Sequence, residues 1–321
     1  MERGSTVFSD RLRYAVIAVV FAAGVAMAVA LPIATREAYA FQHFVRPPVS
    51  DWLGSFDPAN HVLDSLLMKR TVAALRLSAF SLRAPEVLGL ALYLCAIARL
   101  ASRMRKGAWA AIGLGGAVYL CLEYATPAAG LDLALAFWSC GLVFAIEYLT
   151  RYQRDAWQYL NLSGVCLGLS VAANFCFILP AFGLALLLLM TTRQFRPWAD
   201  RLLVTAVVTA FVLTAIPFSH ASAGQLARLL SEASRESGRS PEDLSGLIAI
   251  LRRESRGKTV RIAASPDLAP VLEFYQARYR EAGWRIVPVI APADFYVIGL
   301  SAASQAGGQV LYHGRTVVLA R

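Results

Sequence analysis

Apolar runs alternate with short polar segments along the chain up to about residue 220. Tyr14–Ile33 is long enough to cross the hydrocarbon core of a bilayer as one helix. Further runs of this kind cover about residues 86–101, 107–123, 130–149 and 202–219. The run Leu160–Met190 is too long for one crossing, and we interpret it as two shorter helices that break near Asn174 and Pro180. The pattern therefore predicts about seven membrane helices.

The basic residues indicate which helix ends lie in the cytoplasm. They gather just before the first run and just after the second, at Arg3, Arg11, Arg13, Arg99, Arg103, Arg105 and Lys106. By the positive-inside rule both segments remain in the cytoplasm, and the count of crossings then places the C-terminus outside. A cleavable signal peptide is the alternative for the first run, because AVA and AYA resemble cleavage sites. We expect an uncleaved anchor, because the apolar part of a signal peptide usually spans only about 7–15 residues.

Polar chemistry gathers between Asp57 and Pro85, in the outer loop 34–84 that follows the first run. The apolar residues there recur at roughly helical spacing, while Asp64, Lys69 and Arg70 interrupt the opposite face. A charged group at the bilayer centre costs roughly 2.5–3.5 kcal/mol on insertion scales, so we do not expect this helix to span the membrane. We expect it to lie at the interface with its polar face toward the head groups. An amphipathic linker without chemistry is the alternative.

From about residue 221 the composition becomes that of a soluble domain. Helices are predicted over 241–255 and 266–283, and strands over 258–264, 285–290, 294–300, 309–314 and 315–321. These elements predict a small α/β domain, residues 221–321, attached to a transmembrane core, residues 1–220. The domain has no glycine-rich phosphate loop, no HExxH motif and no nucleophile elbow. We interpret His313 as a surface or edge residue rather than a ligand.

Composition agrees with a membrane protein. Hydrophobic residues make up 57% of the chain, charged residues 16%, and the mean hydropathy is +0.53, which together exclude an ordinary soluble globule. The net charge of +10 does not indicate a nucleic-acid partner, because the basic residues form short clusters between apolar runs. All five cysteines fall inside apolar segments without a CxxC pair, so we expect neither a disulfide framework nor a cluster of thiolates around a metal.

Three local motifs support a family resemblance. Asn60-His61-Val62-Leu63 opens the leucine-rich helix of the outer loop, Arg83-Ala84-Pro85 stands at the next span, and residues 168–189 form the paired short helices. With the apolar anchor and the external soluble domain, these motifs resemble the GT-C superfamily of membrane glycosyltransferases over about residues 14–220. Within it, the chain is similar to bacterial relatives of protein O-mannosyltransferases and aminoarabinose transferases.

The resemblance implies a reaction and a set of site residues. Such enzymes take a sugar from a polyprenyl-phosphate donor in the outer leaflet, with a first-loop carboxylate as base and basic side chains around the departing phosphate. Glu37 corresponds to that carboxylate here. The resemblance implies substrate-binding roles for His61, Arg83, Lys69, Arg70, Glu123 and Tyr124. Ordinary snorkelling of Lys69 and Arg70 at the head-group level is the alternative for these two side chains.

Two positions depart from the family pattern. The first loop usually begins with an Asp-Glu pair, but this chain has Arg36-Glu37, and an arginine cannot accept a proton. The next outer turn usually reads Ala-Arg-Gly-Tyr, whereas Ala128-Ala129-Gly130-Leu131 stands here. The chain is also shorter than such relatives between the helical core and the soluble domain.

We therefore expect a multi-pass α-helical protein of the bacterial inner membrane that acts in the cell envelope as a GT-C-like glycosyltransferase. The alternative is a noncatalytic protein of the same fold that binds a membrane lipid or a membrane protein partner. Whether a divalent metal takes part is left open by the resemblance. A transporter is less favoured, because the chain has no internal repeat and no acidic residue lies deep within a span except Asp132, near the end of its span.

Overall fold

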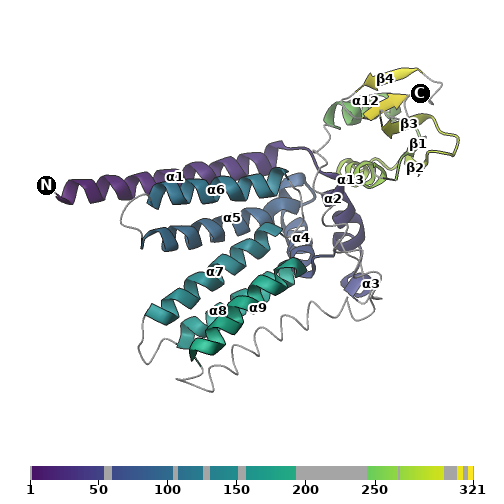
Figure 1. Cartoon of the computed structure of the whole chain (residues 1–321). Coiled ribbons are helices and arrows are strands. Elements are labelled where there is room, and N and C mark those ends of the chain that lie inside the picture. Colours follow the sequence, from purple (N-terminus) through teal and green to yellow (C-terminus); the bar gives the residue numbers. More distant parts are fainter. Residues whose placement is uncertain are drawn as a thin grey trace.

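The computed structural model describes residues 2–53, 60–103, 108–125, 131–150, 157–192, 244–266, 268–299, 309–313 and 317–320. Its larger part is a set of helices that run alongside one another (Figure 1). These are α1 (Glu2–Ala30), α5 (Ala79–Ala101), α6 (Ala108–Ala125), α7 (Leu131–Thr150), α8 (Trp157–Ala173) and α9 (Ile178–Thr192). They correspond to the apolar runs of the sequence. The predicted span over 202–219 lies outside the described residues.

Three of the described helices are long and apolar enough to cross a membrane. They cover Arg11–Ala30, Ala79–Ala101 and Leu131–Thr150. Shorter apolar stretches lie in α6, at Ala110–Leu120, and in α9, at Ile178–Leu188. The chain thus has the membrane-protein character expected from its hydropathy.

Small residues allow α5, α6 and α7 to approach closely. A Cβ atom on Gly89 of α5 would lie 2.7 Å from the hydroxyl oxygen of Tyr119 and 3.2 Å from Cα of Leu133. Tyr119 is buried and donates from its hydroxyl to the carbonyl oxygen of Glu86 at 3.2 Å. Between α7 and α8, Ser163 donates to the carbonyl oxygen of Gly141 at 2.8 Å. Such contacts suit helices that pack in lipid. There the hydrophobic effect does not drive helices together, and small residues let the backbones approach closely enough for van der Waals contacts and hydrogen bonds.

The predicted break inside the long apolar run is confirmed. Helix α8 ends at Ala173, a short 3₁₀ turn covers Phe175–Phe177 (η2), and α9 begins at Ile178. Asn174 produces the break, because its side-chain oxygen accepts from the backbone N–H of Cys176 at 2.9 Å. Pro180 lies in the first turn of α9, where its missing N–H would have no partner in the helix.

Short helices occupy one end of the bundle. They are α2 (Thr35–Ala40), the π-helical turn η1 (Phe41–Val45), α3 (Val49–Leu53) and α4 (Val62–Leu75). Helix α4 is the predicted interfacial helix, but it ends at Leu75, and Arg76 has a left-handed φ of 64°. Ser78 then caps α5, since its Oγ accepts from the N–H of Ser81 at 3.0 Å and Ser81 Oγ accepts from the N–H of Ser78 at 2.9 Å. The second long helix therefore begins at Ala79 rather than at residue 86, and Arg83-Ala84-Pro85 lies inside it.

The C-terminal elements form the small α/β unit that the sequence predicts. They are α12 (Ser245–Ser255), β1 (Val260–Ala264), α13 (Ala269–Tyr279), β2 (Trp284–Pro288), β3 (Phe295–Gly299), β4 (Val310–His313) and β5 (Val317–Ala320). The strand order is β2-β1-β3-β5-β4. Strand β1 is parallel to β2 and β3, whereas β5 is antiparallel to β3 and β4. In register, Val260 lies opposite Trp284 and Ile262 opposite Phe295.

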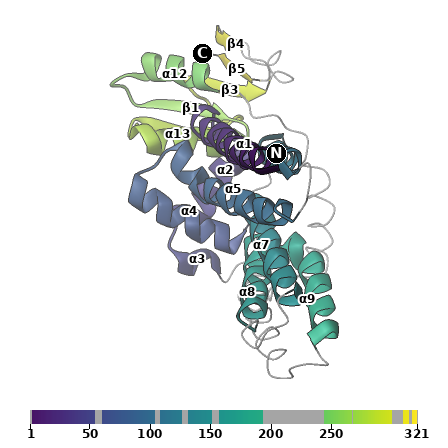
Figure 2. The same cartoon turned by 90° about the vertical axis from the view of Figure 1, so that its left-hand side faces the viewer.

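This unit packs against the short helices at the end of the bundle (Figures 1 and 2). The rings of Phe41 and Phe274 meet edge to face, with centroids 5.7 Å apart. One buried apolar cluster contains Ile33 and Ala38 from the N-terminal part together with Phe274 and Tyr275 from α13. The core of the α/β unit therefore continues into the segment that follows α1, and this junction positions the candidate site.

Candidate functional site

Glu37 lies in the first turn of α2, directly after the chain leaves α1. Its Oε2 atom accepts from the backbone N–H of Ala34 at 2.6 Å, so the carboxylate caps its own helix. The same oxygen accepts from Arg83 Nη2 at 2.6 Å, and Oε1 accepts from Arg83 Nε. The two side chains therefore form a bidentate ion pair, with 5% of the Arg83 side chain and 12% of the Glu37 side chain exposed.

The remaining donors of Arg83 bind backbone carbonyls. Nη1 donates to the oxygens of Ala28 at 3.3 Å and Leu31 at 2.9 Å, and Nη2 donates to the oxygen of Pro32 at 2.7 Å. A guanidinium has five N–H donors, and these contacts with the two to Glu37 use all of them. Arg83 therefore joins the end of α1 to α2 and orients Glu37. The sequence expectation of a phosphate contact would require one of these bonds to break.

Asp64 supplies a second carboxylate beside the ion pair. Its side chain is 1% exposed, and among the described residues neither carboxylate oxygen has a hydrogen-bond partner. Burial, with a further contribution from the negative charge of Glu37, raises the pKa of Asp64 to about 7. Asp64 is thus protonated in a large fraction of molecules near neutral pH. The sequence placed this residue on the polar face of the interfacial helix, and the structure instead buries it.

The other predicted site residues have separate surroundings. Lys69 donates from Nζ to the carbonyl oxygens of Val45, at 2.8 Å, and Pro47, which ties α4 to the end of η1. Arg70 is exposed on α4, and His61 stands at the N-cap position of the same helix. Glu123 and Tyr124 belong to α6, but their side chains lie outside the described part of the structure, as does the side chain of Arg36.

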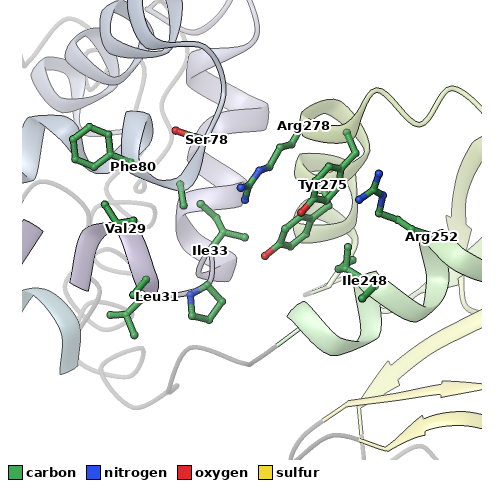
Figure 3. A pocket seen from close by; sticks show the side chains of 14 residues that line it. Val29, Leu31, Ile33, Ser78, Phe80, Ile248, Arg252, Tyr275 and Arg278 are labelled. Carbon is green, nitrogen blue, oxygen red and sulfur yellow. The ribbon is translucent and has the colours of Figure 1, made fainter. Parts of the chain in front are cut away.

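A cavity of about 550 Å³ lies where the α/β unit meets the ends of α1 and α5. Figure 3 shows the apolar side chains of Val29, Leu31 and Phe80 on one side and the polar side chains of α12 and α13 on the other. The lining residues are Val29, Ala30, Leu31, Pro32, Ile33, Ser78, Ala79, Phe80, Ile248, Ala249, Arg252, Tyr275, Arg278 and Tyr279. Sequence analysis missed this cavity, because it requires segments more than 200 residues apart to meet.

The segment Leu31–Pro32, just after α1, contacts both the cavity and the ion pair. Leu31 and Pro32 line the cavity, and their carbonyl oxygens accept from Arg83. Burial raises the pKa of the Tyr275 hydroxyl, while the positive charge of Arg278, a hydrogen bond with the backbone of Ile33 and the positive charge of Arg83 act in the opposite direction. The positive charge of Arg83 therefore acts on the Tyr275 hydroxyl across this segment. Glu37 itself does not belong to the cavity wall.

A second ion cluster stands at the other end of the bundle. Glu147 of α7 is buried, and its Oε1 lies 2.7 Å from Arg99 Nη2 and 2.9 Å from Arg103 Nη2. Both arginines belong to the group that the sequence places on the cytoplasmic side. Glu86 and Glu147, like Asp132, are buried in helices that are long and apolar enough to span a membrane.

Among the described residues, no three His, Cys, Asp or Glu side chains lie together in a way that could hold a metal ion. Comparison of the chain with protein-family models, with curated proteins and with solved structures gave no match.

Proposed function

We propose that this protein is a divergent GT-C-type glycosyltransferase that moves a sugar from a polyprenyl-phosphate donor to an acceptor on the outer face of the bacterial inner membrane. In this proposal about seven helices span the membrane, and the α/β unit lies outside. The observation that supports it most strongly is the oriented carboxylate of Glu37 at the end of a potential membrane span, held by Arg83 beside Asp64.

In the proposed reaction, an acceptor hydroxyl gives its proton to the Glu37 carboxylate while its oxygen attacks the anomeric carbon of the sugar. The bond between that carbon and the phosphate oxygen breaks, and polyprenyl phosphate leaves with the electron pair. Arg83 acts as a positioning residue, because its bonds fix both oxygens of Glu37. Asp64 modulates the charge beside the base, since protonating its carboxyl removes a negative charge near Glu37.

One observation favours the noncatalytic alternative. Both oxygens of Glu37 and all five N–H donors of Arg83 have partners inside the protein, as in an ion pair that serves only to hold α1, α2 and α5 together. In that case the fold persists without sugar transfer, and the α/β unit or the cavity binds a lipid or a protein partner.

Sugar transfer in membranes separates the two candidates. Membranes containing the wild-type protein, and matched membranes lacking it, are incubated with labelled polyprenyl-phosphate sugars of several kinds. Label that moves into an acceptor only in the first sample supports the transferase. If no donor gives transfer although the protein is present in the membrane and folded, the transferase proposal fails and the noncatalytic candidate takes its place.

A further inference from the structure

The cavity between the α/β unit and the helix ends has a chemistry that the proposed reaction does not use. We propose that it binds the phosphate head group of an outer-leaflet lipid, with Arg278 and Arg252 at the phosphate and the ends of α1 and α5 against the start of the lipid tail. This inference rests on the proposed outer location of the α/β unit and is independent of sugar transfer.

Two walls of different character make the cavity suitable for an amphiphile. Val29 and Leu31 come from the end of α1 and the segment after it, and Phe80 comes from the first turn of α5. These residues lie at or beside one end of the potential spans Arg11–Ala30 and Ala79–Ala101, the depth at which acyl chains meet head groups. A soluble polar ligand would gain nothing from this apolar wall, whereas a lipid tail would.

The opposite wall is basic, with Arg252 and Arg278 both exposed on it. Arg278 is exposed, and among the described residues no carboxylate lies within 4 Å of its guanidinium. Arg252 donates from Nε to Glu281 at 3.0 Å, and its guanidinium carbon lies 3.9 Å from the centroid of the Tyr279 ring. This stacking fixes the plane of the guanidinium. Planar guanidinium groups bind phosphate oxygens well, and a second positive charge nearby adds to the attraction.

The tyrosines on α13 complete the polar side. Tyr275 and Tyr279 stack with ring centroids 5.9 Å apart, and both line the cavity. Tyrosine suits this position, because its ring packs against a lipid while its hydroxyl reaches the head group. The volume of about 550 Å³ is within the range of about 300–1,000 Å³ for small-ligand pockets.

Native mass spectrometry of the purified full chain in detergent tests the proposal. The probes are phosphatidylglycerol, a polyprenyl phosphate and inorganic phosphate, each compared on the wild-type protein and on Arg278→Gln. Arg253→Gln is the matched control, because Arg253 is exposed on the same unit and does not line the cavity. We expect at least one of the two lipids to bind the wild type and the Arg253 variant equally, and the Arg278 variant about tenfold more weakly or worse, as for loss of a charged hydrogen bond.

The lipid arms distinguish the source of the phosphate. Preference for phosphatidylglycerol identifies a bulk-lipid site, and preference for polyprenyl phosphate identifies a donor or product site. Inorganic phosphate that binds as tightly as either lipid would overturn the proposal, because the apolar wall would then contribute nothing. Equal lipid binding by the Arg278 and Arg253 variants would overturn it as well.

A steric variant tests the apolar wall separately. Ala30→Trp places a large side chain at the edge of the cavity, and Ala15→Trp places the same side chain at another exposed position of α1. We expect lipid binding to fall with the first variant and to remain with the second. Unchanged binding in Ala30→Trp would show that the lipid binds elsewhere. Because this readout is binding, failure here leaves the sugar-transfer proposal untouched, and absence of transfer leaves this proposal untouched.

Discussion

Arg83 of α5 and Glu37 of α2, 46 positions apart in the chain, form a buried bidentate ion pair. The pair lies where the chain turns from the first long helix into the short helices, and the α/β unit packs against these short helices. Because Arg83 also binds three backbone carbonyls of the α1 end, a single side chain holds α1, α2 and α5 in one arrangement. The position of Glu37, and with it the candidate site, depends on this arginine.

Replacing Arg83 with methionine should therefore destabilise the protein strongly. The change leaves the Glu37 carboxylate largely buried without its partner and frees three carbonyls, and breaking one side of a buried pair costs about 3–5 kcal/mol. Thermal unfolding of the detergent-solubilised protein measures the effect. Arg253→Met is the control, since its pair with Glu254 is exposed and contributes at most about 1 kcal/mol. Similar melting temperatures for the two variants would mean that the buried pair does not organise the junction.

The buried carboxyl of Asp64 makes stability depend on pH. Its pKa is about 7 in the folded protein and about 3.9 in an unfolded chain, so the folded state holds the proton more tightly. The resulting stabilisation is fully present below about pH 4 and is lost as pH rises through about 7. Asparagine cannot ionise and so avoids this loss.

Asp64→Asn should thus match the wild type near pH 4 and exceed it at pH 8 by up to about 4 kcal/mol, since one pKa unit corresponds to about 1.36 kcal/mol. Melting temperatures of both proteins between pH 4 and pH 8 give the comparison. A difference that stays constant over this range would contradict a carboxyl that titrates near neutral pH.

An added methyl group at Gly89 should destabilise the packing of α5 against α7. A Cβ there would lie 3.2 Å from the backbone of Leu133, and α7 cannot move away without disturbing its other contacts. Overpacking of this kind costs typically about 1–3 kcal/mol, so Gly89→Ala should lower the melting temperature. Gly183→Ala is the matched control, because no atom of the described residues lies within 4 Å of its added Cβ. If both substitutions changed the melting temperature by the same amount, α5 and α7 would not approach each other closely at Gly89.

Labelling of an introduced cysteine tests the proposed orientation. Arg256 is exposed on the α/β unit, and Ser102 is exposed just after α5, at the end of the bundle that carries Arg99 and Arg103. In intact cells, a membrane-impermeant maleimide should label Arg256→Cys but label Ser102→Cys only after permeabilisation. The parent protein corrects for native thiols. Labelling in the opposite pattern would place the α/β unit in the cytoplasm and remove it from outer-leaflet lipids.

Much of the fold follows from local sequence patterns. Asn174 marks the break between α8 and α9, and alternating apolar residues mark the strands of the α/β unit. The sequence pattern predicts a start for the second span near residue 86, but α5 begins at Ala79. The signal for this start is the mutual capping of Ser78 and Ser81, and these residues also fit the pattern of the preceding amphipathic helix. Local patterns specify which elements form, but a boundary inside a continuous helical pattern depends on a few hydrogen bonds.

The candidate site was predictable only in part. The sequence identified Glu37 and Arg83, and the structure brings them together. It could not indicate that Arg83 would use its other donors on the end of α1, because those carbonyls approach only in the folded protein. The burial of Asp64 could not be predicted from the sequence either, since an acidic residue in the first turn of a helix usually faces solvent.

The role of Glu37 as the base is tested by the rate of sugar transfer by Glu37→Gln relative to wild type, at equal amounts of folded protein in the membrane. Glu254→Gln makes the same chemical change on α12, at a side chain that is 30% exposed and lies outside the candidate site, and serves as the control. If Glu37 is the base, its variant should lose about 10²–10⁴-fold in rate, as for removal of a general base, while the control keeps the wild-type rate. Full activity in folded Glu37→Gln would rule out Glu37 as the base, because the ion pair would then be structural and the chemistry would lie elsewhere.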